Sequence, residues 1–340
     1  MTSQLRKDHI SGRWVIIASE RSKRPDDFRP AQAEKKENPS GFCPFCLGNE
    51  TKTPPEVFSL RKKGSKPDEP GWSVRVVPNK FPALTRGEPP QRLVQGLFES
   101  MDGVGVHEVI IETPEHEREW SDLSLMHLRD VLWTCQQRVR SIETESQYQY
   151  IQVFKNKGKE AGASLSHPHS QIVATPIIPK RVKEEIWSSD RYFRRAKECL
   201  LCRTYQEETK ARERIVRVNS HFAVIAPFAS RSPFEMRIHP LRHTPFFSQV
   251  SDEELLALAD ILLAVLGKLK AILSDPPFNV ILHQGPPPGL GRKTWANILN
   301  IFHWHLEIIP VLTRLAGFEW GTGFYINPVS PESATSYLKE

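Results

Sequence analysis

The chain has 340 residues, of which 25% are charged and 39% are hydrophobic. This composition is typical of a folded globular protein and excludes a disordered or fibrous chain, and the length suits two domains or one large domain. The net charge of +6 is small and scattered along the chain, which favours small polyanionic ligands over nucleic acid as partners.

The sequence carries no pattern typical of secretion or membrane insertion. Its first ten residues, MTSQLRKDHI, lack the apolar stretch of a secretory signal. The longest apolar run, Leu255 to Leu273, contains three charged residues and repeats at helical spacing, so it predicts an amphipathic helix and not a membrane span. We therefore expect a cytoplasmic protein that does not bind membranes.

The first half of the chain contains, in order, a CxxC pair, a strand, a strand ending in histidine, an amphipathic helix, a strand and a His-x-His pair. These are Cys43/Cys46, 74–84, 107–116, the helix opened by Ser121, 150–158 and His167/His169. Period-two alternation along a strand would place both imidazoles of the His-x-His pair on one face.

The second half repeats this order after a charged helix predicted over 179–197. Its members are Cys199/Cys202, 215–229, 234–243, the helix opened by Ser251, 278–285 and His303/His305. We interpret the repetition as a duplication with units at 1–178 and 179–340. Many short strands and the absence of a regular βαβ alternation predict an α+β fold, mostly antiparallel and flanked by helices. No dinucleotide-binding or P-loop glycine motif is present.

The two CxxC pairs indicate metal sites. In a chain without a secretory signal, such pairs favour metal or redox chemistry over a disulfide framework, and no thioredoxin-like βαβ pattern supports a redox role. Two thiolates and two imidazoles complete a tetrahedral zinc site. The first half offers Cys43, Cys46, His116 and one histidine of the pair at 167 and 169; the second offers Cys199, Cys202, His243 and one of His303 and His305. The alternative is that these cysteines are small buried apolar residues, as we expect for Cys135.

The segment 156–171, NKGKEAGASLSHPHSQ, combines features of a phosphate-handling loop. Its glycines free the backbone for close approach to a ligand, and Lys157 and Ser164 offer hydrogen-bond donors. A histidine can attack phosphorus through one ring nitrogen if the other is held by a hydrogen bond, for which the carbonyl of His167 is a natural acceptor. His169 is therefore the candidate nucleophile.

The position two residues after each His-x-His pair distinguishes the halves. Gln171 follows His169, whereas Glu307 follows His305. An amide can donate to a phosphoryl oxygen, while a carboxylate at the same place repels a phosphate. This difference predicts that only the first half is catalytic.

The segment GASLSHPHSQI resembles the active-site signature of the galactose-1-phosphate uridylyltransferase family of the histidine-triad superfamily, whose halves are a duplicated domain. The resemblance spans nearly the whole chain through the motifs RWV, RSKRP, CPFC, NKFPAL, ETPEH, FKNKG, HPHSQ, LHQGP and HWHLEIIP. The ending GFEWGTGFYINPVSPE and the second CxxC pair are also similar to a plant branch of the family, the ADP-glucose phosphorylases, which transfers AMP in place of UMP.

The resemblance implies a ping-pong reaction, in which His169 takes a nucleotidyl group from a nucleoside diphosphate sugar and releases a hexose 1-phosphate. Gln171 and Ser164 match positions that contact the phosphoryl group, Asn79 and Asn156 match positions that contact the nucleotide, and Glu319 matches a hexose-binding carboxylate. Arg21 and Arg24 match basic residues that meet the phosphates across a homodimer interface. Tyr325 replaces a family glutamine near the hexose, which departs from the galactose pattern.

For the metals, the resemblance implies zinc at Cys43, Cys46, His116 and His167, and at Cys199, Cys202, His243 and His303. Glu185, His283, His303 and His305 also match an iron-binding set found in members without the second CxxC pair. Because both sets use His303, we expect one ion there, and two thiolates favour zinc.

The main prediction is a uridylyltransferase acting between a UDP-sugar and a hexose 1-phosphate, as in galactose metabolism. The alternative is an ADP-glucose phosphorylase that transfers adenylyl to phosphate. A third hypothesis is a zinc-stabilised protein that binds a nucleotide without catalysis, against which the complete Gly-Ser-His-Gln set argues.

Overall fold

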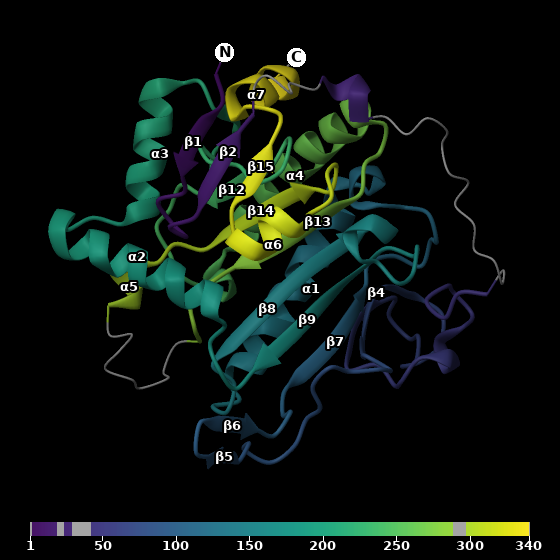
Figure 1. Cartoon of the computed structure of the whole chain (residues 1–340). Helices are drawn as coiled ribbons and strands as arrows, with labels where there is room; N and C mark the ends of the chain where they lie inside the picture. The colour runs from purple at the N-terminus through teal and green to yellow at the C-terminus, as the bar shows by residue number, and fades with distance from the viewer. Residues whose placement is uncertain (1, 19–23, 29–41, 288–296, 340) are drawn as a thin grey trace.

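The computed structural model describes residues 2–18, 24–28, 42–287 and 297–339. Within these residues the fold is α+β, as predicted, and a ten-stranded sheet with the order β10-β11-β12-β14-β13-β8-β9-β7-β4-β3 dominates it (Figure 1). Its strands are β3 (Phe58–Arg61), β4 (Trp72–Pro78), β7 (Val106–Ile111), β8 (Tyr150–Lys157), β9 (His169–Thr175), β10 (Ile215–Val218), β11 (Phe222–Ile225), β12 (Met236–Pro240), β13 (Phe278–His283) and β14 (His305–Pro310).

The sheet consists of two five-stranded parts that we call the N-terminal half (β3, β4, β7, β9, β8) and the C-terminal half (β13, β14, β12, β11, β10). They meet where β8 pairs with β13. Read outward from this seam, both parts have the same strand order and antiparallel pairing. We propose that they are copies of one unit, as the sequence repetition predicts; the boundary between residues 178 and 179 stays a prediction.

Two long helices cover one face of the sheet. They are α1 (Leu125–Glu143), which packs on β3, β4 and β8, and α4 (Asp252–Leu273), which packs on β10 and β11 and against α1. Their apolar side chains and those of the sheet form one continuous core, which includes Cys135 as expected. The candidate active site lies on the opposite face of the sheet.

The sequence predictions of helix starts were correct for α4 and wrong for α1. Ser251 caps α4 through a capping box with Glu254. Ser121 lies instead in a short 3-10 helix, η4 (Trp120–Asp122), and the hydroxyl of Ser124 caps α1 by accepting from the N–H of His127 (3.2 Å). Ser124 offers the same cap chemistry one turn later, so the pattern alone did not separate the two serines.

Several predicted strands have different bounds. The strand predicted over 74–84 ends at Pro78, and the run 215–229 folds into β10 and β11 around a turn held by the Asn219 side chain. β9 and β14 begin at the second histidine of each His-x-His pair. The first histidine therefore precedes the strand, which corrects the expectation that both lie along it.

The remaining helices lie around the C-terminal half. They are α2 (Lys180–Ala196), which confirms the helix predicted over 179–197, α3 (Leu200–Ala211), α5 (Ile298–Ile301), α6 (Gly317–Thr322) and α7 (Pro331–Lys339). Among the described residues, none of the helices has the length and apolar character needed to cross a membrane.

Two small sheets complete the fold. β1 (Gln4–Lys7) pairs with β2 (Trp14–Ile17), which pairs in parallel with β15 (Tyr325–Asn327), so the two ends of the chain lie side by side (Figure 1). β5 (Arg92–Gln95) and β6 (Phe98–Met101) form a hairpin at the opposite end of the molecule.

Candidate active site and metal clusters

His169 is the first residue of β9, on the sheet face opposite α1. Alternation along β9 directs Ser170 and Ile172 to the core and leaves His169 and Gln171 on the other face. The His169 ring is buried edge-on to Phe45, with the ring centres 5.5 Å apart. Its Nδ1 donates to the carbonyl of His167 (2.8 Å), as the sequence predicts, and this leaves Nε2 with its lone pair.

The environment of His169 favours the neutral form of its imidazole. Burial lowers its pKa, and the Lys155 ammonium adds to this effect, although the His167 carbonyl opposes it. A neutral ring with a held Nδ1 proton can use Nε2 as a nucleophile.

Gln171 is oriented by His107, a residue to which the sequence analysis assigned no function. The N–H of Ala83 donates to Nδ1 of His107 (3.0 Å), so the His107 proton lies on Nε2 and is donated to Oε1 of Gln171 (2.8 Å). Asn79 lies beside this pair, with its Nδ2 3.0 Å from the His107 Nε2. The amide N–H groups of Gln171 are thereby left free to donate to a phosphoryl oxygen. Only the contact itself reveals this function of His107.

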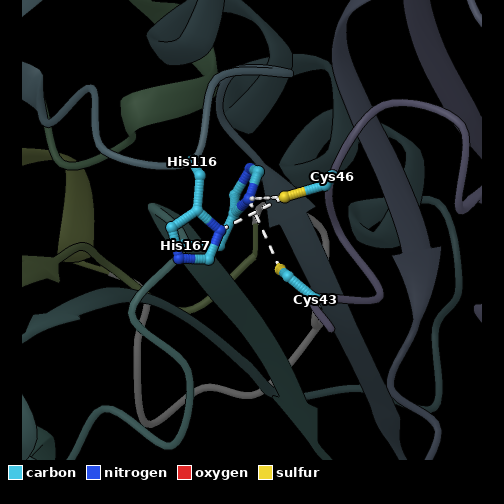
Figure 2. Close-up of side chains that lie close together, drawn as sticks. All are labelled: Cys43, Cys46, His116 and His167. Atoms are coloured by element: carbon cyan, nitrogen blue, oxygen red, sulfur yellow. Dashed lines mark hydrogen bonds between the residues drawn. The ribbon is translucent and has the colours of Figure 1, made fainter. Parts of the chain in front are cut away.

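The first CxxC pair and two histidines converge as a metal-binding group (Figure 2). Nδ1 of His116 lies 3.2 Å from Sγ of Cys46, and Nδ1 of His167 lies 3.6 Å from both sulfurs. The structure thus selects His167, and not His169, as the fourth member. Two thiolates and two imidazoles at these separations fit a tetrahedral ion such as zinc.

The outer nitrogens of both histidines in this group are held by the protein. Nε2 of His167 donates to the carbonyl of Thr113 (2.8 Å), and Nε2 of His116 is 3.0 Å from the hydroxyl of Ser166. Burial lowers the pKa of His167 to about 4, so the ring is neutral at neutral pH. Each imidazole therefore presents Nδ1 to the centre of the group, as metal ligation requires.

The second CxxC pair forms an equivalent group with His243 and His303. Nδ1 of each histidine lies 3.4 Å from Sγ of Cys202. Nε2 of His243 donates to the carbonyl of Leu299 (2.8 Å). This group holds the same donor set as the first.

Glu185, His283 and His305 form a separate group, to which His303 does not belong. Nδ1 of His283 is 3.1 Å from the Glu185 carboxylate, and its ring stacks on that of His305 with the centres 4.7 Å apart. The structure therefore places His303 with the thiolates of Cys199 and Cys202. The zinc set and the iron set, which shared His303 in the sequence analysis, thus form two separate groups.

Glu307, the counterpart of Gln171, lies in a cage of arginines that sequence reasoning missed. Its carboxylate contacts Arg181 (2.7 Å), Arg231 (2.5 Å) and Arg237 (3.2 Å). Burial alone would raise the pKa of Glu307, but Arg181, Arg231 and the ring of His283 hold it well below its usual range. The C-terminal half thus carries a buried anion of its own at the position that Gln171 occupies in the N-terminal half.

Three predicted substrate residues, Asn156, Lys157 and Ser164, lie at the end of β8 or in the loop that follows it. Asn156 accepts a hydrogen bond from Asn279 across the β8–β13 seam (2.8 Å), and Ser164 is exposed in the loop before His167. The Lys157 ammonium is already paired with Asp275 (2.5 Å). Their contacts with substrate stay predictions.

Two further predicted substrate residues, Glu319 and Arg24, lie outside the N-terminal half of the sheet. Glu319 accepts from the N–H of Ala316 at the start of α6 (2.9 Å). Arg24 is exposed, and its N–H donates to Asp27 (2.7 Å). Arg21 lies outside the described residues.

Two family models match parts of this chain. Residues 1–179 match the model for the N-terminal domain of galactose-1-phosphate uridyl transferase, and residues 124–338 match a domain of unknown function, DUF4921. The chain belongs to the galactose-1-phosphate uridylyltransferase family. It is 37% identical to ADP-glucose phosphorylase of Arabidopsis thaliana, over 99% of this chain and 92% of that protein. It is 29% identical to galactose-1-phosphate uridylyltransferase of Thermotoga maritima, over 99% and 98% respectively.

The family relationship extends to the three-dimensional structure. The crystal structure of Arabidopsis ADP-glucose phosphorylase with bound ADP-glucose has a TM-score of 0.82 and 35% identity, covering 99% of both chains. A uridylyltransferase structure has a TM-score of 0.74 and 30% identity, covering 98% of this chain and 97% of the other. The protein is a nucleotidyltransferase of this family, as predicted. Among the relatives compared, identity and TM-score favour the ADP-glucose phosphorylase alternative over the main prediction of a uridylyltransferase.

Proposed function

We propose that this protein is an ADP-glucose phosphorylase, which transfers the adenylyl group of ADP-glucose to inorganic phosphate through a covalent intermediate on His169. The observation that carries the proposal is the 37% identity to the Arabidopsis phosphorylase over nearly the whole chain, against 29% for the Thermotoga uridylyltransferase at similar coverage. The second thiolate group and Tyr325 in place of the family glutamine support the same choice.

In the first step, Nε2 of His169 attacks the α-phosphorus of ADP-glucose. The bond between that phosphorus and the bridging oxygen breaks, and the oxygen leaves with the electron pair as part of glucose 1-phosphate. Because the leaving group is a phosphate, it needs little protonation, which suits a neutral amide at Gln171. The amide stabilises charge on the phosphoryl oxygens as the bond forms.

In the second step, an oxygen of inorganic phosphate attacks the adenylyl phosphorus. The bond to Nε2 breaks, the electron pair returns to His169 and ADP is released. The hydrogen bond from Nδ1 to the His167 carbonyl persists through both steps, so the same nitrogen attacks and leaves.

The proposal is tested by incubating the protein with ADP-glucose or UDP-glucose labelled at the α-phosphate. We expect acid-labile label from ADP-glucose that phosphate converts to ADP, and no label in His169→Gly. Faster labelling by UDP-glucose, with discharge by galactose 1-phosphate, would instead establish the uridylyltransferase suggested by the N-terminal family match. The absence of label from both sugars would falsify the covalent mechanism.

We further propose that zinc binds at both Cys2His2 groups. When bound at the first, the ion ties the loop of Cys43 and Cys46 to His167, two residues before the nucleophile. Two zinc ions per chain are expected by metal analysis, and one in either Cys43→Ser or Cys199→Ser. Only Cys43→Ser is expected to lose labelling. Iron in the wild-type protein, or a zinc content unaffected by Cys199→Ser, would contradict the second assignment.

We also propose a homodimer in which Arg21 and Arg24 of one chain reach the phosphates bound to the other. The exposure of Arg24 supports this arrangement. Sedimentation analysis is expected to give twice the chain mass, and Arg24→Ala is expected to weaken binding of ADP-glucose. A fully active monomer would contradict the proposal.

A further inference from the structure

A buried charged network lies behind the strand that carries His169. Glu112 is 0% exposed, and Lys155 and Ser170 are each 1% exposed. The Lys155 ammonium contacts the carboxylates of Glu112 (2.7 Å) and Glu119 (3.1 Å), and the Ser170 hydroxyl donates to the other oxygen of Glu112. Buried ion pairs contribute little net stability compared with apolar packing, so their presence calls for another reason.

The backbone and side chain of Glu112 hold both neighbours of the nucleophile. The Glu112 N–H donates to the carbonyl of Pro168 (3.3 Å), and its carboxylate accepts from Ser170. The next residue, Thr113, accepts at its carbonyl from Nε2 of His167. Residues 167, 168 and 170 are therefore all bonded to one dipeptide, and His169 lies between them.

The Lys155 ammonium is held in place by the two carboxylates that it contacts. Burial would lower its pKa, but the carboxylates of Glu112 and Glu119 raise it, so the side chain stays an ammonium. Its Nζ also lies 5.5 Å from the centre of the Trp120 ring. The cation thus fixes the Glu112 carboxylate against the 3-10 helix η4.

The C-terminal half replaces two members of this network with leucine. Lys155 is paired with Ser170 across β8 and β9, and the equivalent pair across β13 and β14 is Leu282 with Leu306. Both leucines are buried in the main core. The same strand pairing therefore forms without charged residues.

Glu112 also has an apolar counterpart. It follows Ile111, which is paired with His169 between β7 and β9. The alignment of β12 with β14 puts Pro240 at the equivalent place in the C-terminal half. The whole network is thus present behind the strand with the proposed nucleophile and absent behind its counterpart.

We propose that Glu112, Lys155 and Ser170 position His169 for attack on the α-phosphorus. They are positioning residues, because they lie behind the strand and do not touch the reacting atoms. The inference rests on the proposed function. By fixing the backbone on both sides of His169, the network keeps Nε2 aligned with the phosphorus, and loss of alignment slows attack without weakening ligand binding.

The test uses the full-length protein and measures single-turnover labelling by α-labelled ADP-glucose over a range of concentrations. We expect Glu112→Gln to lower the limiting rate constant on the order of ten- to a hundredfold, with the half-saturating concentration and the final extent of labelling little changed. The final extent reports the active fraction, so a variant that merely unfolds in part is recognised. Zinc content is measured in parallel.

Ser170 provides a milder variant and a rescue. Ser170→Ala is expected to slow labelling in the same way, and Ser170→Thr to keep the wild-type rate, because threonine retains the hydroxyl and Ser170 lines a small cavity. The matched control is Glu208→Gln, which breaks the buried pair of Glu208 with Arg214 in the C-terminal part of the chain and is expected to leave the rate constant unchanged.

Two outcomes would overturn the inference. If the wild-type protein is labelled and both Glu112→Gln and Ser170→Ala react at its rate, the positioning role is wrong while the proposed function stands. If the wild-type protein is labelled by neither nucleotide sugar, the proposed function and this inference are both overturned.

Discussion

Around the two strands that begin at His169 and His305, β9 and β14, the halves of the large sheet bury charged side chains on opposite faces. In the N-terminal half, Glu112 and Lys155 lie behind the strand, and the neutral Gln171 lies in front. In the C-terminal half the back is apolar, and Glu307 lies in front among arginines. The same strand order thus supports one face open to an anionic ligand and one filled by an internal anion.

The two halves share a scaffold and differ in the side chains around it. Both halves carry a Cys2His2 group and a histidine at the first position of the equivalent strand. In both, Nδ1 of that histidine donates to the carbonyl two residues earlier, at 2.8 Å for His169 and 3.2 Å for His305. If His169 alone is the nucleophile, as we propose, catalytic competence depends on the few side chains around the ring, and not on the fold.

The largest expected difference between the halves is in nucleophilic function. His169→Asn is expected to lower labelling by ADP-glucose by several orders of magnitude, because no other group replaces the attacking nitrogen. His305→Asn, the matched variant of the other half, is expected to keep the wild-type rate. Acid-labile label is measured in both, and loss of label in His305→Asn alone would reverse the assignment of the catalytic half.

A second variant gives the N-terminal half the negative charge that Glu307 provides in the C-terminal half. Gln171→Glu places a carboxylate near the phosphate, and two like charges about 4 Å apart repel by about 4 kcal/mol at an effective dielectric constant near 20. The labelling rate is therefore expected to fall about a thousandfold. The free energy of unfolding in urea serves as the control, and a rate near that of the wild type would show that Gln171 does not face the phosphate.

The reciprocal variant tests the arginine cage. Glu307→Gln leaves Arg181, Arg231 and Arg237 without their shared carboxylate, and uncompensated buried charge is expected to lower the free energy of unfolding by about 3–5 kcal/mol. Urea denaturation measures the change. The labelling rate of the folded fraction is expected to stay unchanged, and a neutral effect on stability would mean that the cage is not a structural substitute for a ligand.

The smallest expected effects are equal in the two halves. Ser124 caps α1 and Ser251 caps α4, each by accepting a backbone N–H at 3.2 Å. Ser124→Ala and Ser251→Ala are each expected to cost about 1 kcal/mol in urea denaturation and to leave the labelling rate unchanged. A slowed reaction in Ser124→Ala alone would show that the helix in the catalytic half also affects the site.

Patterns that are local along the chain could be predicted from the sequence. The capping of α4 by Ser251 and the span of α2 both follow from neighbouring residues, and both are confirmed. The capping of α1 was misassigned because Ser121 and Ser124 satisfy the same local rule. The strand bounds at the His-x-His pairs were also misassigned, because the first histidine leaves the strand to meet the cysteines.

The sequence by itself determined the repeated order of CxxC, helix and His-x-His, the candidate nucleophile His169, and the contrast between Gln171 and Glu307. These depend on residue types at short spacings. Only the tertiary structure decided that His303 joins the thiolates, that His107 orients Gln171, and that Glu112 brackets the nucleophile. Those contacts join residues 58 to 101 positions apart, and local periodicity carries no information on which distant side chains meet when strands pair.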